Sequence, residues 1–351
     1  NLFTPQVSVA YALDVFGLNR RTAESARAQE QSVHFQLVAA HLTLTSNVAL
    51  AAIQDAALQA EIDATRQLIE IETKSVEILK FQAARGYASG IDVAAQESQL
   101  AQVAATLPPL LKQAAQQHDL LASLTGRFPS EAAIARIDLA SLQLPADLPV
   151  SLPSKLVEQR PDVRQAEANL HVASAQVGVA EANRFPNILL TVVAGSTSTA
   201  FGQGFTPGTN FWTVGGALTA PIFQGGTLLH QQRAAEANYR QATEQYRSTV
   251  LGAFQNVADS LTAIQQDAEG LRTAAAAADA AKVTLDLTRR RLQDGYASGL
   301  ALLNAQQAYQ QARVALVQAQ AARFSDTVAL YQSLGGGWWR RADLAKDTDA
   351  N

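Results

Sequence analysis

Hydrophobic and polar residues alternate along the first stretch of the chain. Odd-numbered positions from Val7 to Val15 carry Val, Tyr or Leu, whereas the even-numbered positions between them carry Ser, Ala or Asp. This period of two residues predicts a β-strand with one apolar face. The segments 187–200 and 210–223 are also rich in β-branched and aromatic residues, and a turn-rich loop, GQGFTPG, lies between them. They predict two further strands.

Most of the remaining chain has the composition of long helices. Residues 22–85 contain neither Pro nor Gly, which predicts one helix of about 95 Å at 1.5 Å per residue. Further helices are expected over 91–124, 161–184, 227–294 and 300–331. Pro108 and Pro109 fall inside the helix over 91–124 and are expected to kink it. Residues 126–160 contain four prolines and predict irregular chain with a short strand and a short helix.

The chain repeats itself. The pentapeptide GYASG occurs at 86–90 and at 295–299, an offset of 209 residues. This repeat predicts two similar halves, each with strands, a long helix, a GYASG turn and a return helix. The expected divisions are a first repeat over 1–125, an equatorial segment over 126–160, a second repeat over 161–334 and a C-terminal tail over 335–351. The first repeat lacks a counterpart of the helix and strand that open the second, so we expect at least about 50 further residues before residue 1.

The last predicted helix carries apolar residues at alternating spacings of three and four. Its seam consists of Leu300, Leu303, Gln307, Gln310, Val314, Val317, Ala321, Phe324, Val328 and Tyr331. A heptad pattern predicts helices that pack side by side as a coiled coil. The two glutamines indicate that part of the seam faces water or a polar partner.

Composition excludes several classes of protein. The chain has 351 residues and a formal charge of −4, and without a basic stripe nucleic-acid binding is disfavoured. It contains no Cys, which excludes disulfides, thiolate metal sites and a cysteine nucleophile within this sequence. No run of 18 apolar residues occurs, so no membrane-spanning helix is expected.

The expected strands are 10–14 residues long, enough to cross a bilayer as tilted strands of about 9–11 residues. A half-buried sheet on a soluble domain is the alternative for any single strand. Three or four strands cannot close a membrane barrel, which needs about eight or more. Strands of this length beside very long helices favour an oligomer in which several chains contribute strands to one barrel and helices to one tube.

No constellation for catalysis or cofactor binding is found. The chain lacks a G-x-S-x-G motif, a P-loop and a dinucleotide-binding G-x-G-x-x-G, so no enzyme, no catalytic residue and no cofactor is predicted. His34 and His41 are seven residues apart and share a helix face, but a metal site needs three or four ligands. Solvated or packed histidines are therefore preferred to a metal site. Trp338 and Trp339 are expected to pack the chain end onto the equatorial segment, with an aromatic membrane anchor as the alternative.

Four stretches of sequence carry a resemblance to a known family. They are LVEQRPDVRQAEANLHVASAQVGVAEANRFPNI at 156–188, APIFQGG at 220–226, the paired GYASG turns, and LYQSLGGGWW at 330–339. The chain resembles the TolC-like outer-membrane efflux proteins over essentially its whole length, in the lipoprotein branch that includes OprM and NodT. The family's signal peptide, lipid-modified (palmitate-bearing) cysteine, first helices and first strand are expected before residue 1.

The resemblance implies a mainly α-helical fold with membrane β-strands. Three identical chains would form a twelve-stranded barrel in the outer membrane, in contact with its lipid, and an α-helical tube in the periplasm. The implied role is a passive exit duct for drugs or other small substrates. The implied partners are a periplasmic adaptor (membrane fusion) protein and an inner-membrane pump of the RND type. A periplasmic coiled-coil adaptor or scaffold without its own pore is the alternative, although adaptors normally have a single hairpin.

The resemblance also assigns roles to individual residues. The two turns would form the periplasmic tip that contacts the adaptor: Gly86, Tyr87, Ala88, Ser89 and Gly90, and Gly295, Tyr296, Ala297, Ser298 and Gly299. Leu300, Asn304 and Gln307 share one helix face, and in OprM-like relatives the matching positions carry Leu, Asp and Arg that form the pore constriction. Here both charged partners are amides, so an acidic cation-trapping ring is not expected at this gate. Asp92 is the further candidate for the gate, and an ordinary coiled-coil seam is the alternative for all of these positions.

Overall fold

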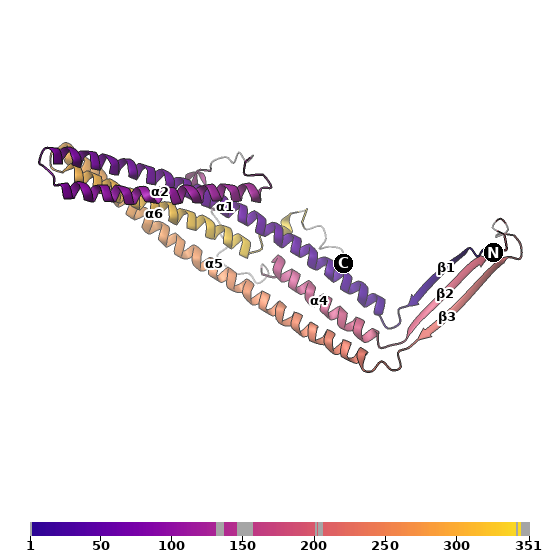
Figure 1. Cartoon of the computed structure of the whole chain (residues 1–351). Helices are drawn as coiled ribbons and strands as arrows, with labels where there is room; N and C mark the ends of the chain where they lie inside the picture. Colours follow the sequence, from indigo (N-terminus) through magenta and orange to yellow (C-terminus); the bar gives the residue numbers. More distant parts are fainter. Residues whose placement is uncertain are drawn as a thin grey trace. The chain divides into compact units, whose positions relative to one another are not determined.

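A computed structural model describes residues 2–130, 137–145, 157–200, 202, 206–341 and 343–344. The elements are β1 (Gln6–Leu13), α1 (Leu18–Ala84), α2 (Gly90–Leu124), α4 (Pro161–Ala182), β2 (Asn187–Ser196), β3 (Asn210–Thr219), α5 (Thr227–Gln293) and α6 (Gly299–Ser333), with short 3₁₀ turns at Leu139–Ser141 and Trp338–Arg340. The chain divides into two compact units (Figure 1). Unit 1 comprises Asn1–Val38 and Pro161–Gly252, and unit 2 comprises Ala39–Arg160 and Ala253–Asn351.

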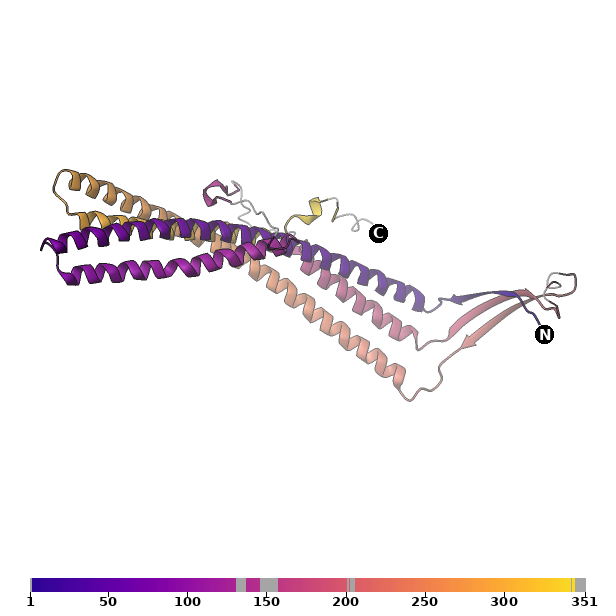
Figure 2. The ribbon, with the colours of Figure 1, turned by 45° about the horizontal axis from the view of Figure 1, so that its top comes forward.

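Unit 1 contains the sheet and three helical segments. The strands pair antiparallel in the order β1-β2-β3, and the segments of α1, α4 and α5 in this unit run side by side in that order (Figures 1 and 2). The turn from β1 into α1 is fixed by Asp14, whose carboxylate accepts the backbone N–H groups of Asn19 and Arg20 at 2.8 and 2.9 Å. These donors would otherwise lack partners at the start of a helix.

Unit 2 is built from two helical hairpins. Helices α1 and α5 each have 67 residues, and α2 and α6 each have 35. Leu18 and Thr227 are 209 positions apart, as are Gly90 and Gly299, so the elements follow the offset of the GYASG repeat. The two units each take part of both repeats, so the division at residues 125, 160 and 334 stays a prediction.

The core of unit 2 lies along the helix interfaces. Val317, Phe324 and Val328 of α6 pack against the cluster of Ile53, Ala57 and Ala321, as the heptad seam predicts. A second cluster joins α1 and α2 around Leu58, Ile62 and Ala114. A third joins α5 and α6 around Val257, Leu330 and Leu334.

Two details differ from the sequence predictions. At the end of α6 the buried residue is Leu330, whereas Tyr331 is exposed, because a straight helix drifts relative to a strict heptad. Helix α2 contains Pro108 and Pro109 and ends at Leu124, as expected; the kink at these prolines stays a prediction. In the described residues of 126–160 the structure has a 3₁₀ turn at Leu139–Ser141 and no strand; the remainder, 131–136 and 146–156, lies outside the described residues.

One 18-residue window in α1 is apolar enough to pass a length-and-composition test for a membrane span, a test that core helices of soluble proteins also pass.

Candidate functional surfaces

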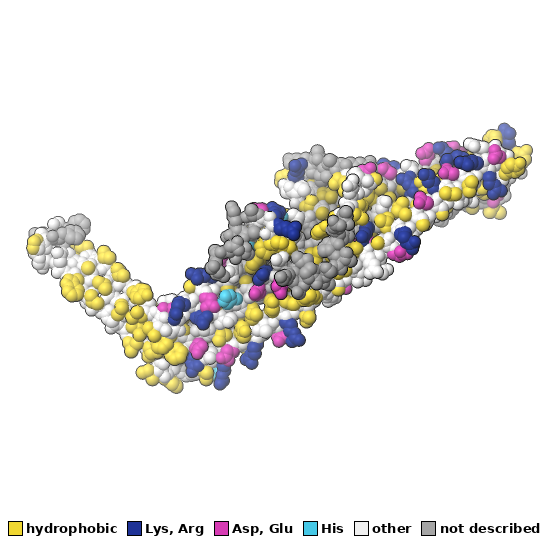
Figure 3. All heavy atoms as spheres, turned by 180° about the vertical axis from the view of Figure 1, so that it is seen from behind, with side chains coloured by type: hydrophobic (Ala, Val, Ile, Leu, Met, Phe, Trp, Pro, Cys, Tyr) yellow, Lys and Arg dark blue, Asp and Glu magenta, His cyan; other side chains and the backbone are white. Residues whose placement is uncertain are grey.

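The sheet of unit 1 has one fully apolar face. The register aligns Val9 with Val192 and Val192 with Val214, and strand alternation puts every second residue on the same side. Rows on that face consist of Val7, Ala194 and Trp212; Val9, Val192 and Val214; Tyr11, Leu190 and Gly216; and Leu13, Ile188 and Leu218. Hydrophobic side chains cover much of the visible surface over the strands (Figure 3).

This apolar face is exposed, with Trp212 at 76% and Val7 at 71% of full exposure. The opposite face is mixed. It carries small and polar residues, such as the row of Ala10, Thr191 and Gly215, together with Leu189, Val193 and Phe211. A contiguous exposed apolar surface marks a membrane or partner contact. Strands of eight to ten residues with apolar and polar faces have the pattern of membrane β-strands that are apolar towards lipid and polar towards a lumen.

The two GYASG turns have the same backbone conformation. Gly86 and Gly295 both have φ of +79°, a left-handed geometry that favours glycine. Tyr87 N–H donates to the Gln82 carbonyl at 2.9 Å, and Tyr296 N–H donates to the Arg291 carbonyl at 2.7 Å. These bonds close the helix ends as Schellman motifs.

The turns present aromatic side chains at one end of unit 2. Figures 1 and 2 both place the two turns at the same end of this unit. Tyr87 is 82% exposed and Tyr296 is 78% exposed. The two identical pentapeptides therefore form two matching turns between helices, each with a solvent-exposed tyrosine.

The helices that leave the two turns begin differently. Ser89 and Asp92 form a reciprocal capping box, in which Asp92 N–H donates to Ser89 Oγ at 3.1 Å and Ser89 N–H donates to Asp92 Oδ2 at 3.0 Å. Ser298 caps α6 by accepting the Ala301 N–H at 3.2 Å, but Ala301 has no carboxylate to return the bond. The hydrogen bonds from the Ser89 side chain and backbone lower the pKa of Asp92. The spacing S-x-x-D at residues 89–92 is a sequence signal for this cap, so the structure gives Asp92 a capping role in addition to its candidacy for the gate.

The candidate gate residues Leu300, Asn304 and Gln307 lie on the first three turns of α6. Leu300 is 44% exposed, Asn304 is exposed and Gln307 is partly buried. Leu303, between them in sequence, is buried and takes the packing role. Leu300 and Asn304 are therefore on a face that the single chain leaves open, whereas the carboxylate of Asp92 is engaged in its helix cap.

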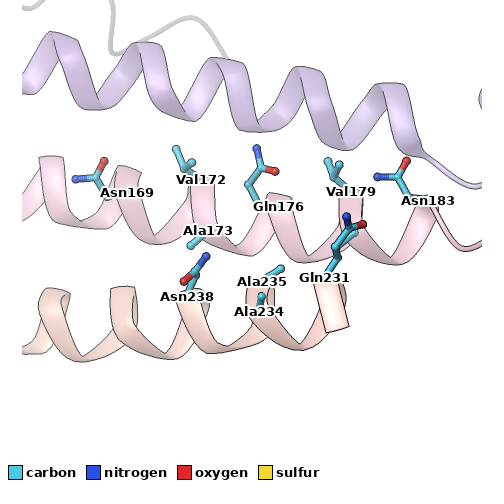
Figure 4. A pocket seen from close by; sticks show the side chains of 11 residues that line it. Asn169, Val172, Ala173, Gln176, Val179, Asn183, Gln231, Ala234, Ala235 and Asn238 are labelled. Carbon is cyan, nitrogen blue, oxygen red and sulfur yellow. The ribbon is translucent and has the colours of Figure 1, made fainter. Parts of the chain in front are cut away.

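A groove in unit 1 is lined by neutral amides. It has a volume of about 600 Å³, and its amides come from α4 and α5 at heptad spacing: Asn169, Gln176 and Asn183, and Gln231 and Asn238 (Figure 4). Two of these amides also contact α1, because Ser32 Oγ donates to Asn169 Oδ1 at 2.7 Å and Gln176 Nε2 donates to Ser25 Oγ at 2.8 Å. Val and Ala side chains line the groove between these amides, and its lining contains no charged residue.

Two further expectations concern metal binding and the chain end. Among the described residues no group of three His, Asp or Glu side chains is arranged to hold a metal ion; His171 instead contacts Glu24 at 2.9 Å. Trp338 is buried, and its Nε1 donates to the carbonyl of Gln159 at 2.8 Å. Trp338 thus packs against the last residues of the segment 126–160, as predicted.

The sheet has one lipid-compatible face, and two helices of 67 residues continue from its strands. These features are typical of an outer-membrane channel protein with a long helical extension. The chain belongs to the outer membrane efflux protein family, whose sequence pattern matches residues 1–127 and 152–336. It is an outer-membrane exit duct for efflux, with its helical part in the periplasm. The alternative of a periplasmic adaptor without a pore does not fit this family.

Individual relatives agree with this assignment. The chain is 31% identical over 336 residues to the pyoverdine export outer membrane protein OpmQ of Pseudomonas aeruginosa, covering 96% of this chain and 70% of that protein. It is 30% identical over 343 residues to nodulation protein T of Rhizobium leguminosarum, with the same two coverages. The structure matches the outer membrane protein VceC of Vibrio cholerae with a TM-score of 0.79 and 26% identity, covering 96% of this chain and 87% of that one. The fold class expected from the sequence is confirmed; the single chain shows a three-stranded sheet rather than a closed barrel.

Proposed function

We propose that three copies of this chain form the duct and that it works passively, without a catalytic step. The observation that carries this proposal is the two-faced sheet with open edges. The described sheet ends at β1 on one side and at β3 on the other. Unpaired backbone groups cost several kcal/mol each in lipid, so strands from other copies are needed to continue the sheet until it closes.

The proposed partners are a periplasmic adaptor and an inner-membrane pump of the RND type. The two exposed tyrosine-bearing turns support contact with the adaptor, because exposed aromatic residues are enriched in protein interfaces. The neutral amide groove supports a duct wall that passes different solutes without binding them strongly. Outer-membrane lipid is the proposed contact of the apolar sheet face. The lipid-modified cysteine of the lipoprotein branch stays a prediction.

Arginine substitutions on the two sheet faces test the duct assignment. Val9→Arg puts a charge on the apolar face, where it costs about 2–4 kcal/mol near the bilayer centre. Ser8→Arg is the matched control, one residue earlier and on the opposite face. We expect Val9→Arg to reduce recovery of assembled protein from outer membranes. Ser8→Arg should assemble and change single-channel conductance in planar bilayers. Equal assembly of both variants, or a native mass that is not that of a trimer, would contradict the proposal.

A further inference from the structure

Phe211 is the one aromatic residue that the described strands place on the mixed face of the sheet. The register pairs it with Gly195 of β2, which pairs in turn with Gln6 of β1. This row lies at the end of the sheet away from the helices, because β2 begins at Asn187, next to α4, and ends at Ser196. In a duct whose helical part is in the periplasm, that end of the sheet is the outer mouth.

The space above Gly195 is filled by its neighbours. A methyl carbon added to Gly195 would lie 2.9 Å from Phe211 Cζ, the tip of the aromatic ring. It would also lie 2.9 Å from Gln6 Cβ and 2.7 Å from the carbonyl oxygen of Pro5, an oxygen that accepts the Ser196 N–H at 3.0 Å. A glycine inside a strand often marks such a close approach, and no larger residue fits here without displacing one of these neighbours.

The Phe211 ring leans across the sheet. Side chains of a strand normally stand roughly perpendicular to the sheet. The tip of Phe211 instead lies where a side chain at Gly195 would begin, so the ring points along the sheet towards β2 and covers the glycine. In agreement with this, Phe211 is partly buried, whereas the next residue, Trp212, is 76% exposed.

We propose that Gly195 acts as a seat for the Phe211 ring and thereby keeps the outer mouth of the duct wide. This inference rests on the proposed function, in which three copies form the duct and the mixed face lines its lumen. Three Phe211 rings would then lie at one level of the lumen, and the diameter of a pore helps to decide which solutes pass. A ring that lies over Gly195 leaves this path open, whereas a ring displaced from the glycine projects into it. Gly195 is therefore a positioning residue for Phe211.

Labelling of a thiol deeper in the lumen tests the proposal. This sequence contains no Cys, so Ala217→Cys supplies the thiol, at an exposed position on the same face as Phe211. It lies six residues further along β3, or about 20 Å closer to the helices. Intact cells that carry the full-length protein are treated from outside with a maleimide-bearing polyethylene glycol and, separately, with a small cationic methanethiosulfonate.

Gly195→Ala in this background should lose labelling by the polymer and keep labelling by the small reagent. Gly215→Ala is the matched control. It adds the same methyl group to the same face, at a position where nothing lies within 4 Å, and should keep both labels. Recovery of assembled protein is measured for each variant. Polymer labelling that persists in assembled Gly195→Ala would overturn the proposal.

Phe211→Ala separates the ring from the other contacts of Gly195. Combined with Gly195→Ala, it should restore polymer labelling; a loss that persists in the double variant would assign the effect to Pro5 and would also overturn the proposal. Alone, Phe211→Ala leaves the seat intact and should not change polymer labelling, so the test does not depend on the folding of the glycine variant. A marked gain in Phe211→Ala would show that the native ring already projects into the lumen, contrary to the proposal.

Failure of the duct assignment gives a different result. If the small reagent does not label Ala217→Cys in otherwise native protein, the mixed face does not line a water-filled lumen, and the proposed function itself is contradicted. Labelling by the small reagent in every variant, without the expected loss of polymer labelling in Gly195→Ala, contradicts only the role of Gly195.

Discussion

Arg160 Nη1 donates a 2.6 Å hydrogen bond to the backbone carbonyl of Ser333, 173 residues later in the chain. Both residues are buried. Ser333 is the last residue of α6, and its carbonyl is one of those that a helix end leaves without an intrahelical partner. The guanidinium thus satisfies this carbonyl at the negative end of the helix dipole. The neighbouring Gln159 carbonyl accepts the Trp338 indole, so residues 159–160 hold both the end of α6 and the chain beyond it.

Arg160→Ala is expected to destabilise unit 2. Loss of a buried hydrogen bond from a charged donor costs about 2–3 kcal/mol, because the carbonyl stays buried without that partner. Denaturant unfolding followed by tryptophan emission measures this, since Trp338 lies against the same segment. Arg164→Ala is the control: Arg164 forms an exposed pair with Glu167, which is expected to contribute little. Equal midpoints for the two variants would show that the Arg160 contact is not stabilising.

The carboxyl group of Asp267 makes stability depend on pH. Burial, a hydrogen bond with Asp326 and the charge of Asp326 together raise the pKa of Asp267 to about 6, against the opposing charge of Arg323. A carboxyl with a raised pKa in the folded state stabilises the fold most below its unfolded pKa, and this contribution is lost as pH rises through about 6. We therefore expect stability to fall between about pH 4 and pH 6.5.

Asp267→Asn tests this pH dependence. The variant should remove the fall in stability between about pH 4 and pH 6.5. It should also raise the free energy of unfolding at pH 8 by on the order of 1 kcal/mol, after discounting for solvent screening. Thermal unfolding at several pH values measures both effects. Asp286→Asn, which removes an exposed ion pair with Arg289, is the control and should preserve the slope. A slope that persists in Asp267→Asn assigns the titration to another group.

The sequence predicted the elements of this fold well and the contacts between them poorly. Period-two alternation located β1, and the absence of Pro and Gly located α1, because these patterns are local. The bond from Arg160 to Ser333 depends on tertiary placement, and no local pattern marks it. Gln310 and Arg313 of α6 both donate hydrogen bonds to Gln67 Oε1 of α1. These contacts also depend on how two helices pack, and no local pattern predicts them. By contrast, the cap formed by Ser89 and Asp92 is local, and the spacing S-x-x-D is enough to predict it.

Glutamate at the tip tyrosines tests contact with an adaptor. Tyr87→Glu and Tyr296→Glu place charges on exposed side chains without altering the left-handed glycines beside them. Gly86→Trp would be less informative, because a side chain at φ of +79° also strains the turn. We expect assembly and conductance to persist, while efflux with a partner pump falls by roughly tenfold or more, as for a lost interface anchor. Lys112→Glu, on the exposed surface of α2, is the control. Full complementation of a drug-sensitive strain by both tyrosine variants would rule out docking at these turns.

The gate is expected to bind cations weakly, because it presents amides. In the proposed trimer, three copies of Leu300 and Asn304 would face one axis, and three amides carry no net charge. Three carboxylates at the same place would focus a negative potential on a narrow path and attract multivalent cations strongly. Hexaamminecobalt(III) on the periplasmic side of a planar bilayer should therefore block the native channel weakly, and Asn304→Asp should create strong block. Asp92→Asn is the control, since the Ser89 cap already engages that carboxylate, and it should leave the block unchanged. Tight block of the native channel that survives in Asn304→Ala would place the cation site elsewhere.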